Sequence, residues 1–126
     1  MILKTEGIVL RSLKHQDSNV IVTLYTADYG IRSFIIKAYR TSRSRSRHSY
    51  FQPLSIVDIV FLHKENRSLQ KITESRLSSV LQEVQTHPIK LSMGLAMMEI
   101  VFDTVKEEEE NAPLYQFIKN SILFLD

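Results

Sequence analysis

Three arginines alternate with serines in residues 41–49, which read TSRSRSRHS. In an extended chain, Arg43, Arg45 and Arg47 would project from one side of the backbone about 6.6 Å apart, because each residue advances about 3.3 Å. This spacing suits the successive phosphates of an extended nucleic-acid strand. A guanidinium group makes bidentate contacts with phosphate, and serine hydroxyls also donate to phosphate oxygens. The pattern therefore predicts a contact with nucleic acid.

Aromatic residues flank this run on both sides, at Tyr39 and at residues 50–51. A base stacked on such a ring contributes about 1–3 kcal/mol. Lys37 and Arg40 precede the run, and Arg32 lies earlier in the same predicted strand. The competing interpretation is a solvated loop whose charge is incidental. The nucleic-acid hypothesis assigns contacts with DNA or RNA to Arg32, Lys37, Tyr39, Arg40, Arg43, Arg45 and Arg47.

The charge of the chain is divided unevenly along its length. Residues 1–79 hold 13 Lys and Arg against 6 Asp and Glu, a net charge of +7. Residues 80–126 hold 3 Lys and Arg against 8 Asp and Glu, a net charge of −5. The whole chain is therefore only +2. A split of this kind predicts two units, of which the first meets a polyanion.

The sequence predicts no catalytic residue, no metal site and no cofactor. The chain has no cysteine, which excludes disulfides, thiolate metal sites and a cysteine nucleophile. Its four histidines lack the spacing of metal ligands, and its three glycines form no phosphate-binding loop. A nuclease is disfavoured because no cluster of Asp and Glu could hold its metal ion. We therefore expect a binding protein rather than an enzyme.

The basic first unit has the pattern of a small β-domain. Short β-branched and apolar runs alternate with turn residues, which is typical of an antiparallel barrel or sandwich. We expect five strands, at residues 7–13, 19–26, 31–40, 54–63 and 69–77.

The second unit changes to a helical period. We expect helices over residues 88–106 and 113–125, the second capped by Asn111. The first helix should bury Leu91, Leu95, Met98, Phe102 and Val105, and this apolar face is widened by Met97, Ile100 and Val101. The second should bury Leu114, Phe117, Ile118, Ser121 and Leu125. Because the apolar pattern stops without a polar tail, we expect a fragment of a longer chain that self-associates through exposed helix faces.

The chain shows no membrane or export signal. No apolar stretch approaches the roughly 18–20 residues that a membrane-spanning helix needs. The opening MILKTEGIVLRS lacks the apolar segment and the cleavage site of a signal peptide. We expect a cytoplasmic protein without a membrane partner.

Five short stretches follow one another in a characteristic order. They are TEGIVLRS at 5–12, DSNVIVTLYT at 17–26, DYG at 28–30, KAYR at 37–40 and QPL at 52–54. Over roughly residues 3–77, this series resembles the N-terminal region of RecO recombination mediator proteins. It departs from that family at Ala38–Tyr39, where a small Gly-Ala pair is usual. The cysteine zinc site of some members also has no counterpart here.

The resemblance implies an α+β protein, with an OB-fold barrel at residues 1–79 and the start of an α-helical domain at residues 80–126. It implies a bacterial DNA repair and recombination protein that binds single- and double-stranded DNA, promotes strand annealing and assists recombinase loading. It also implies two partners, a RecR-type mediator protein and the acidic tail of single-strand-binding protein. Two alternatives stay open: an RNA-binding OB module, and a non-catalytic barrel whose basic face docks an acidic protein.

Overall fold

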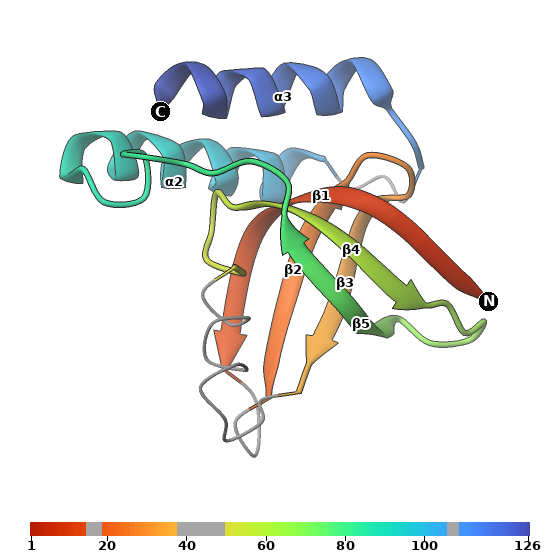
Figure 1. Ribbon diagram of the computed structural model, residues 1–126. Coiled ribbons are helices and arrows are strands. Elements are labelled where there is room, and N and C mark those ends of the chain that lie inside the picture. Colours follow the sequence, from red (N-terminus) through yellow and green to blue (C-terminus); the bar gives the residue numbers. More distant parts are fainter. Residues whose placement is uncertain (15–18, 38–49, 106–108) are drawn as a thin grey trace.

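The computed structural model describes residues 1–14, 19–37, 50–105 and 109–126 (Figure 1). These parts of the chain contain five strands followed by two helices. The strands are β1 (Ile2–Lys14), β2 (Val20–Thr26), β3 (Gly30–Ile36), β4 (Ile56–Leu62) and β5 (Leu69–Leu77). The helices are α2 (Pro88–Thr104) and α3 (Ala112–Leu125). None of the described helices is long and apolar enough to cross a lipid bilayer.

The strands close into a barrel in the order β1-β2-β3-β5-β4. This confirms the prediction of an α+β protein with a five-stranded, OB-like barrel followed by helices. Neighbouring strands are antiparallel except β3 and β5, which are parallel. The expectation of a fully antiparallel barrel is therefore wrong in this detail. A closed ring with an odd number of strands must contain at least one parallel pair.

The long strand β1 serves both of its neighbours. Residues 2–8 pair with β4, and residues 7–14 pair with β2. At Gly7, where the two pairings overlap, an added Cβ atom would lie only 2.8 Å from Leu24 Cδ2. Glycine at this position therefore lets β1 approach β2 closely while it also pairs with β4.

A β-bulge interrupts the pairing of β1 with β2 between Val9 and Arg11. Side chains of a regular strand alternate between the two faces, but a bulge turns two successive residues to the same side. Leu10 is buried against the helices. Arg11 donates a 2.7 Å hydrogen bond to Glu99 of α2, and its guanidinium lies 3.7 Å from the centre of the Phe102 ring. The bulge thus directs both side chains to α2.

The apolar residues form two cores, one inside the barrel and one under the helices. The buried residues of the barrel core are Val9, Val22, Leu24, Phe34, Ile36, Phe51, Val57, Ile59 and Phe61. The second core joins outward-facing residues of the barrel, such as Ile8, Tyr25 and Ile56, to buried residues of α2 and α3. Both helices consequently lie at one end of the barrel (Figure 1).

The turn before β4 connects the two cores. Phe51 is buried inside the barrel, and Leu54 is buried under the helices. Leu54 has φ of 81°, a left-handed conformation that costs a non-glycine residue about 1–2 kcal/mol. Its N–H donates to the Val9 carbonyl, and the Val9 N–H donates to the Ser55 carbonyl, both at 2.9 Å.

Because residues 54 and 55 belong to this turn, the predicted strand 54–63 begins two residues too early.

The two helices begin close to the predicted positions, and most of the residues predicted to face the core are buried or pack against it. The Asn111 side chain accepts a hydrogen bond from the Leu114 N–H, which confirms the predicted cap of α3. Two residues that we expected to be buried are exposed, Leu95 and Phe117. The fully buried residues are Gly94, Met98 and Val101 in α2 and Tyr115, Ile118 and Ile122 in α3, and of these the sequence predicted Met98, Val101 and Ile118. Phe117 is 69% exposed and Phe124 is 94% exposed, so α3 presents apolar surface away from the barrel.

We expect Gly94→Ala to destabilise the protein, because an added Cβ atom would lie 2.6 Å from Leu54 Cδ1 and 2.9 Å from Leu54 Cδ2. The overpacking should exceed the helix-propensity gain of alanine and lower the free energy of unfolding by about 1–2 kcal/mol. Urea denaturation measures this change. In a Leu54→Ala background the same substitution should cost much less. A Gly94→Ala protein as stable as the wild type would contradict this packing.

Candidate nucleic-acid interface

The outer face of the barrel below the helices carries two rows of cross-strand neighbours. The row nearer the helices is Arg11, Thr23, Ser33 and Leu69. The row farther from them is Leu13, Ile21, Ile35 and Lys71. Leu13 is 61% exposed, while Ile21 and Ile35 are half-buried. This face therefore offers an aliphatic strip with a lysine at its β5 edge. Since Arg11 is held by Glu99, it contributes no free charge to the strip.

Exposed lysines gather at the barrel end that lies away from the helices. Lys14 at the end of β1 pairs across with Val20 of β2, which pairs with Ile36 at the end of β3. Lys37 follows directly and is exposed. Lys37 and Lys71 line the same groove between β3 and β5, which has a volume of about 190 Å³. Lys14 of β1, Lys37 just after β3 and Lys71 of β5 thus lie around this end of the barrel.

The structure separates two residues that the sequence hypothesis grouped together. Arg32 and Lys37 are five positions apart, so they point to opposite faces of an extended chain. Arg32 lies on the face of Phe34 and Ile36, which are buried in the barrel core, and its Nε donates a 3.1 Å hydrogen bond to the Tyr29 carbonyl. Lys37 is the predicted contact that lies at the barrel end away from the helices, which we call the open end. The other predicted contacts, Tyr39, Arg40, Arg43, Arg45 and Arg47, lie outside the described residues.

The hairpin between β4 and β5 adds two exposed cations, Lys64 and Arg67. The buried Gln70 side chain fixes its shape: Nε2 donates to the carbonyls of Lys64 and Arg67, and Oε1 accepts from the Lys64 N–H. Asn66 has φ of 70°, as a tight turn requires. In OB-fold barrels, this loop and the β2–β3 face are the regions that bind oligonucleotides.

Sequence reasoning missed Lys14, Lys64, Arg67 and Lys71 as candidate contacts. The polar cluster at residues 64–68 was a local signal for the hairpin. Its position between the fourth and fifth strands could have indicated that it binds nucleic acid, as this loop does in OB-fold barrels. Lys71 gave no local signal, because its position opposite Ile35 depends on the parallel pairing of β3 with β5.

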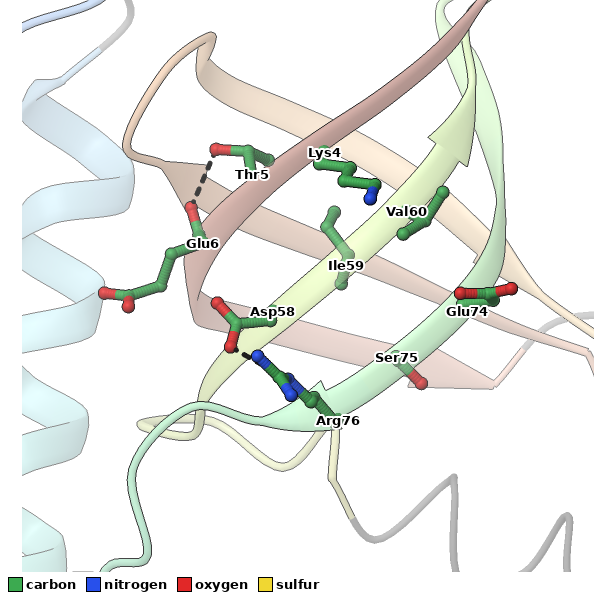
Figure 2. Close-up of a pocket in the computed structure, with 9 residues that line it drawn as sticks. All are labelled: Lys4, Thr5, Glu6, Asp58, Ile59, Val60, Glu74, Ser75 and Arg76. Atoms are coloured by element: carbon green, nitrogen blue, oxygen red, sulfur yellow. Dashed lines mark hydrogen bonds and ion pairs between the residues drawn. The ribbon is translucent and has the colours of Figure 1, made fainter.

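A different pocket, of about 540 Å³, opens on the outer face of β1, β4 and β5 (Figure 2). Its lining contains the cations Lys4 and Arg76 and the carboxylates Glu6, Asp58 and Glu74. Arg76 Nε donates a 3.3 Å hydrogen bond to Asp58 Oδ2. With three carboxylates against two cations, this face suits a polyanion less well than the lysine-bearing end. Within the described residues, no group of three or more His, Asp or Glu side chains could hold a metal ion.

Glu6 lies beside this pocket and ties the barrel to α3. Its Oε1 accepts hydrogen bonds from the Tyr115 hydroxyl and from Lys119 Nζ, both at 2.8 Å, and its Oε2 accepts one from the Ser78 hydroxyl at 2.7 Å. Burial raises the pKa of the Glu6 carboxyl, but the hydrogen bonds and the charge of Lys119 outweigh it, so the pKa is lowered. Burial and the adjacent carboxylate raise the pKa of the Tyr115 hydroxyl, which therefore stays protonated and donates.

The chain matches the model of a known protein family. The model described as "Recombination protein O N terminal" matches residues 1–81 of the chain. The matched region contains the whole barrel and the beginning of the connection to α2.

Curated relatives match the chain over all or nearly all of its length. The DNA repair protein RecO of Bacteroides fragilis is 34% identical over 126 residues, which is 100% of this chain and 52% of the relative. The DNA repair protein RecO of Flavobacterium johnsoniae is 32% identical over 127 residues, covering 100% of this chain and 54% of the relative. That of Pelodictyon phaeoclathratiforme is 29% identical over 124 residues, covering 97% and 46%. The chain spans about half the length of the curated relatives it matches.

The cluster around Glu6 predicts a pH-dependent stability. Because folding lowers the pKa of Glu6, its contribution is present above the unfolded-state value of about 4.5 and is lost as the pH falls through the folded-state value. We expect Glu6→Gln to destabilise the protein at pH 7 and to differ less from the wild type at pH 3. Thermal denaturation across this range measures the difference, with Glu65→Gln as a control in the exposed hairpin. A difference that stays constant with pH would show that the charge of Glu6 is not what holds α3.

Proposed function

The chain belongs to the RecO family of DNA repair proteins, and from this premise we propose that its barrel binds DNA without catalysing a reaction. The binding covers single and double strands, because its main contacts are phosphates, which both forms share. It is nearly independent of sequence and weakens with salt, since each Lys or Arg that meets a phosphate releases counterions.

The observation that carries the proposal is the position of the exposed lysines. The barrel end that precedes the Arg-Ser run (residues 41–49) carries Lys14, Lys37 and Lys71. Elsewhere on the barrel, Arg11 and Arg76 are paired with acidic side chains. Exposed positive charge of the described barrel thus lies beside the segment whose sequence best suits phosphate. The contacts proposed within that segment are Tyr39, Arg40, Arg43, Arg45 and Arg47.

We extend the proposal to the role in repair that the family suggests. Strands whose phosphates are neutralised repel one another less, so a protein that holds two of them promotes annealing. The proposed partners are a RecR-type mediator and single-strand-binding protein, and the proposed outcome is recombinase loading. An RNA-binding function is the alternative, because phosphate contacts do not distinguish the two nucleic acids. Competition between DNA and RNA oligomers of one sequence separates these functions.

The protein should bind a labelled single-stranded DNA and leave it intact. Pure protein should shift the oligonucleotide in an electrophoretic assay, and the strand should keep its length after incubation with Mg²⁺ or Mn²⁺. Metal-dependent cleavage that an Asp or Glu substitution abolishes would refute the non-catalytic part of the proposal. Failure to bind any DNA would refute the whole of it.

Replacing Arg43, Arg45 and Arg47 together by alanine should weaken DNA binding but not folding. Exposed charges contribute little to stability, so the melting temperature should stay close to that of the wild type. The slope of log K against log salt should decrease by about 2, at about 0.7 for each lost single-strand phosphate contact. As a contrast, Tyr39→Ala should lower affinity by about 1–3 kcal/mol with little change in slope if the ring stacks on a base. Wild-type affinity and slope in the triple variant would exclude the run from the interface.

A further inference from the structure

Helix α3 carries apolar residues on two opposite sides. Its buried residues, Tyr115, Ile118 and Ile122, pack against residues of the barrel and of α2. On the other side, Phe117 is 69% exposed and Phe124 is 94% exposed. These two residues are seven positions apart, so they share one face and lie about 10 Å from each other along the helix. A helix that is apolar on opposite sides is typical of an element covered on both.

The exposed face of α3 also lacks the charges that a surface helix normally turns to solvent. Lys119 is the only charged residue of the helix, and its Nζ lies 2.8 Å from Glu6 Oε1 of β1 on the barrel side. The exposed face carries two amides instead, and Gln116 Nε2 donates a 3.0 Å hydrogen bond to Asn120 Oδ1. Two copies of this face can therefore meet without repulsion between like charges.

The exposed apolar row of α2 differs in this respect. Ile89, Met93 and Ile100 are all exposed and share one face of the helix. Asp103 is exposed three positions after Ile100, so its carboxylate lies beside this row. A second copy placed on α2 would bring two carboxylates close together, whereas one placed on α3 would not.

We propose that two copies of this chain pair through α3, with the helices antiparallel about a two-fold axis near Asn120. A two-fold interface requires a self-complementary surface. Phe117 lies three positions before Asn120 and Phe124 lies four positions after it, so Phe117 of one copy meets Phe124 of the other. Contacts between aromatic rings are favourable beyond the area that they bury. The antiparallel direction also places the positive end of each helix dipole beside the negative end of the other.

The exposed area sets the strength of this pairing. A buried phenylalanine covers about 150–250 Å², so the two exposed rings contribute roughly 300 Å² per copy. An interface of standard size takes about 800 Å² per partner. Leu123, which is 41% exposed, enlarges the contact but leaves it below that size. We therefore expect a reversible dimer whose population rises with protein concentration.

Pairing through α3 leaves the proposed DNA-binding end of each barrel free. In Figure 1, α3 is the element farthest from the open end, where Lys14, Lys37 and Lys71 lie. A dimer thus presents two such ends and holds two strands, as the proposed annealing requires. This consequence rests on the proposed function, whereas the pairing itself does not.

Sedimentation velocity without DNA tests the pairing. The average sedimentation coefficient of the wild type should rise with protein concentration, and Phe117→Ser should raise the dissociation constant about tenfold or more. Ile2→Ser is the matched control, because Ile2 lies on the barrel and is 68% exposed. Both variants should keep the wild-type melting temperature. A wild type that stays monomeric at every concentration, or an equal effect of Ile2→Ser, would overturn the proposal.

Engineered cysteines report the direction of the two helices, since the chain contains no cysteine of its own. Asn120→Cys should form a disulfide-linked dimer on mild oxidation, because the axis brings its two copies together. Pro113→Cys should not, because the antiparallel arrangement separates the two copies of residue 113 by about 20 Å. Efficient linkage of Pro113→Cys would show a parallel pair and overturn the proposed arrangement.

Annealing of complementary strands tests the consequence. Phe117→Ser should bind DNA with wild-type affinity but anneal strands more slowly. Annealing at the wild-type rate by this variant would overturn the role of the dimer in annealing. Failure of the wild type to bind DNA would overturn the proposed function, while the sedimentation result would still decide the pairing.

Discussion

Closure of the barrel depends on one strand that must pair with both of its neighbours at once. β1 reaches β4 through its first half and β2 through its second, and Gly7 gives it the space to do so. Because of the bulge between Val9 and Arg11, the outer face of β1 contacts α2 in one part and solvent in another. Leu10 and Arg11 turn to α2, whereas Leu13, farther along, faces solvent in the aliphatic row. The division of the barrel surface into a covered end and an open end follows from this strand.

The contacts that fix the helices also decide which charges stay free. Glu6 accepts three hydrogen bonds from the helical half and from Ser78, and Arg11 is paired with Glu99. Two acidic side chains, Glu6 of the barrel and Glu99 of α2, are thus hydrogen-bonded at the end of the barrel that the helices cover. At the open end, by contrast, the lysines lie beside apolar residues of the neighbouring strands, Lys14 beside Val20 and Lys71 beside Ile35. The sequence-level charge asymmetry becomes a spatial one.

Local patterns were sufficient to predict most elements but not their contacts. The strand predicted at residues 69–77 has the bounds of β5, and Asn111 marked the start of α3. The left-handed conformation of Leu54 left no signal, because leucine is not a residue that favours it. The prediction for α3 was wrong at Phe117, which is exposed, and it missed Tyr115, which is buried where it meets Glu6, a residue 109 positions away. Likewise, the position of Lys71 opposite Ile35 could not be predicted without knowing the register of β3 and β5. The Arg-Ser run could be recognised from the sequence alone.

The central claim is that DNA lies across the open end of the barrel, and an NMR titration tests it most directly. Isotope-labelled protein would be titrated with a short thymidine strand, and amide shift changes would be mapped on the structure. The account predicts that the changes cluster around Lys14, Ile35, Lys37 and Lys71, with few in α2 or α3. Changes that cluster instead around Lys4 and Asp58, in the pocket on β1, β4 and β5, would contradict it.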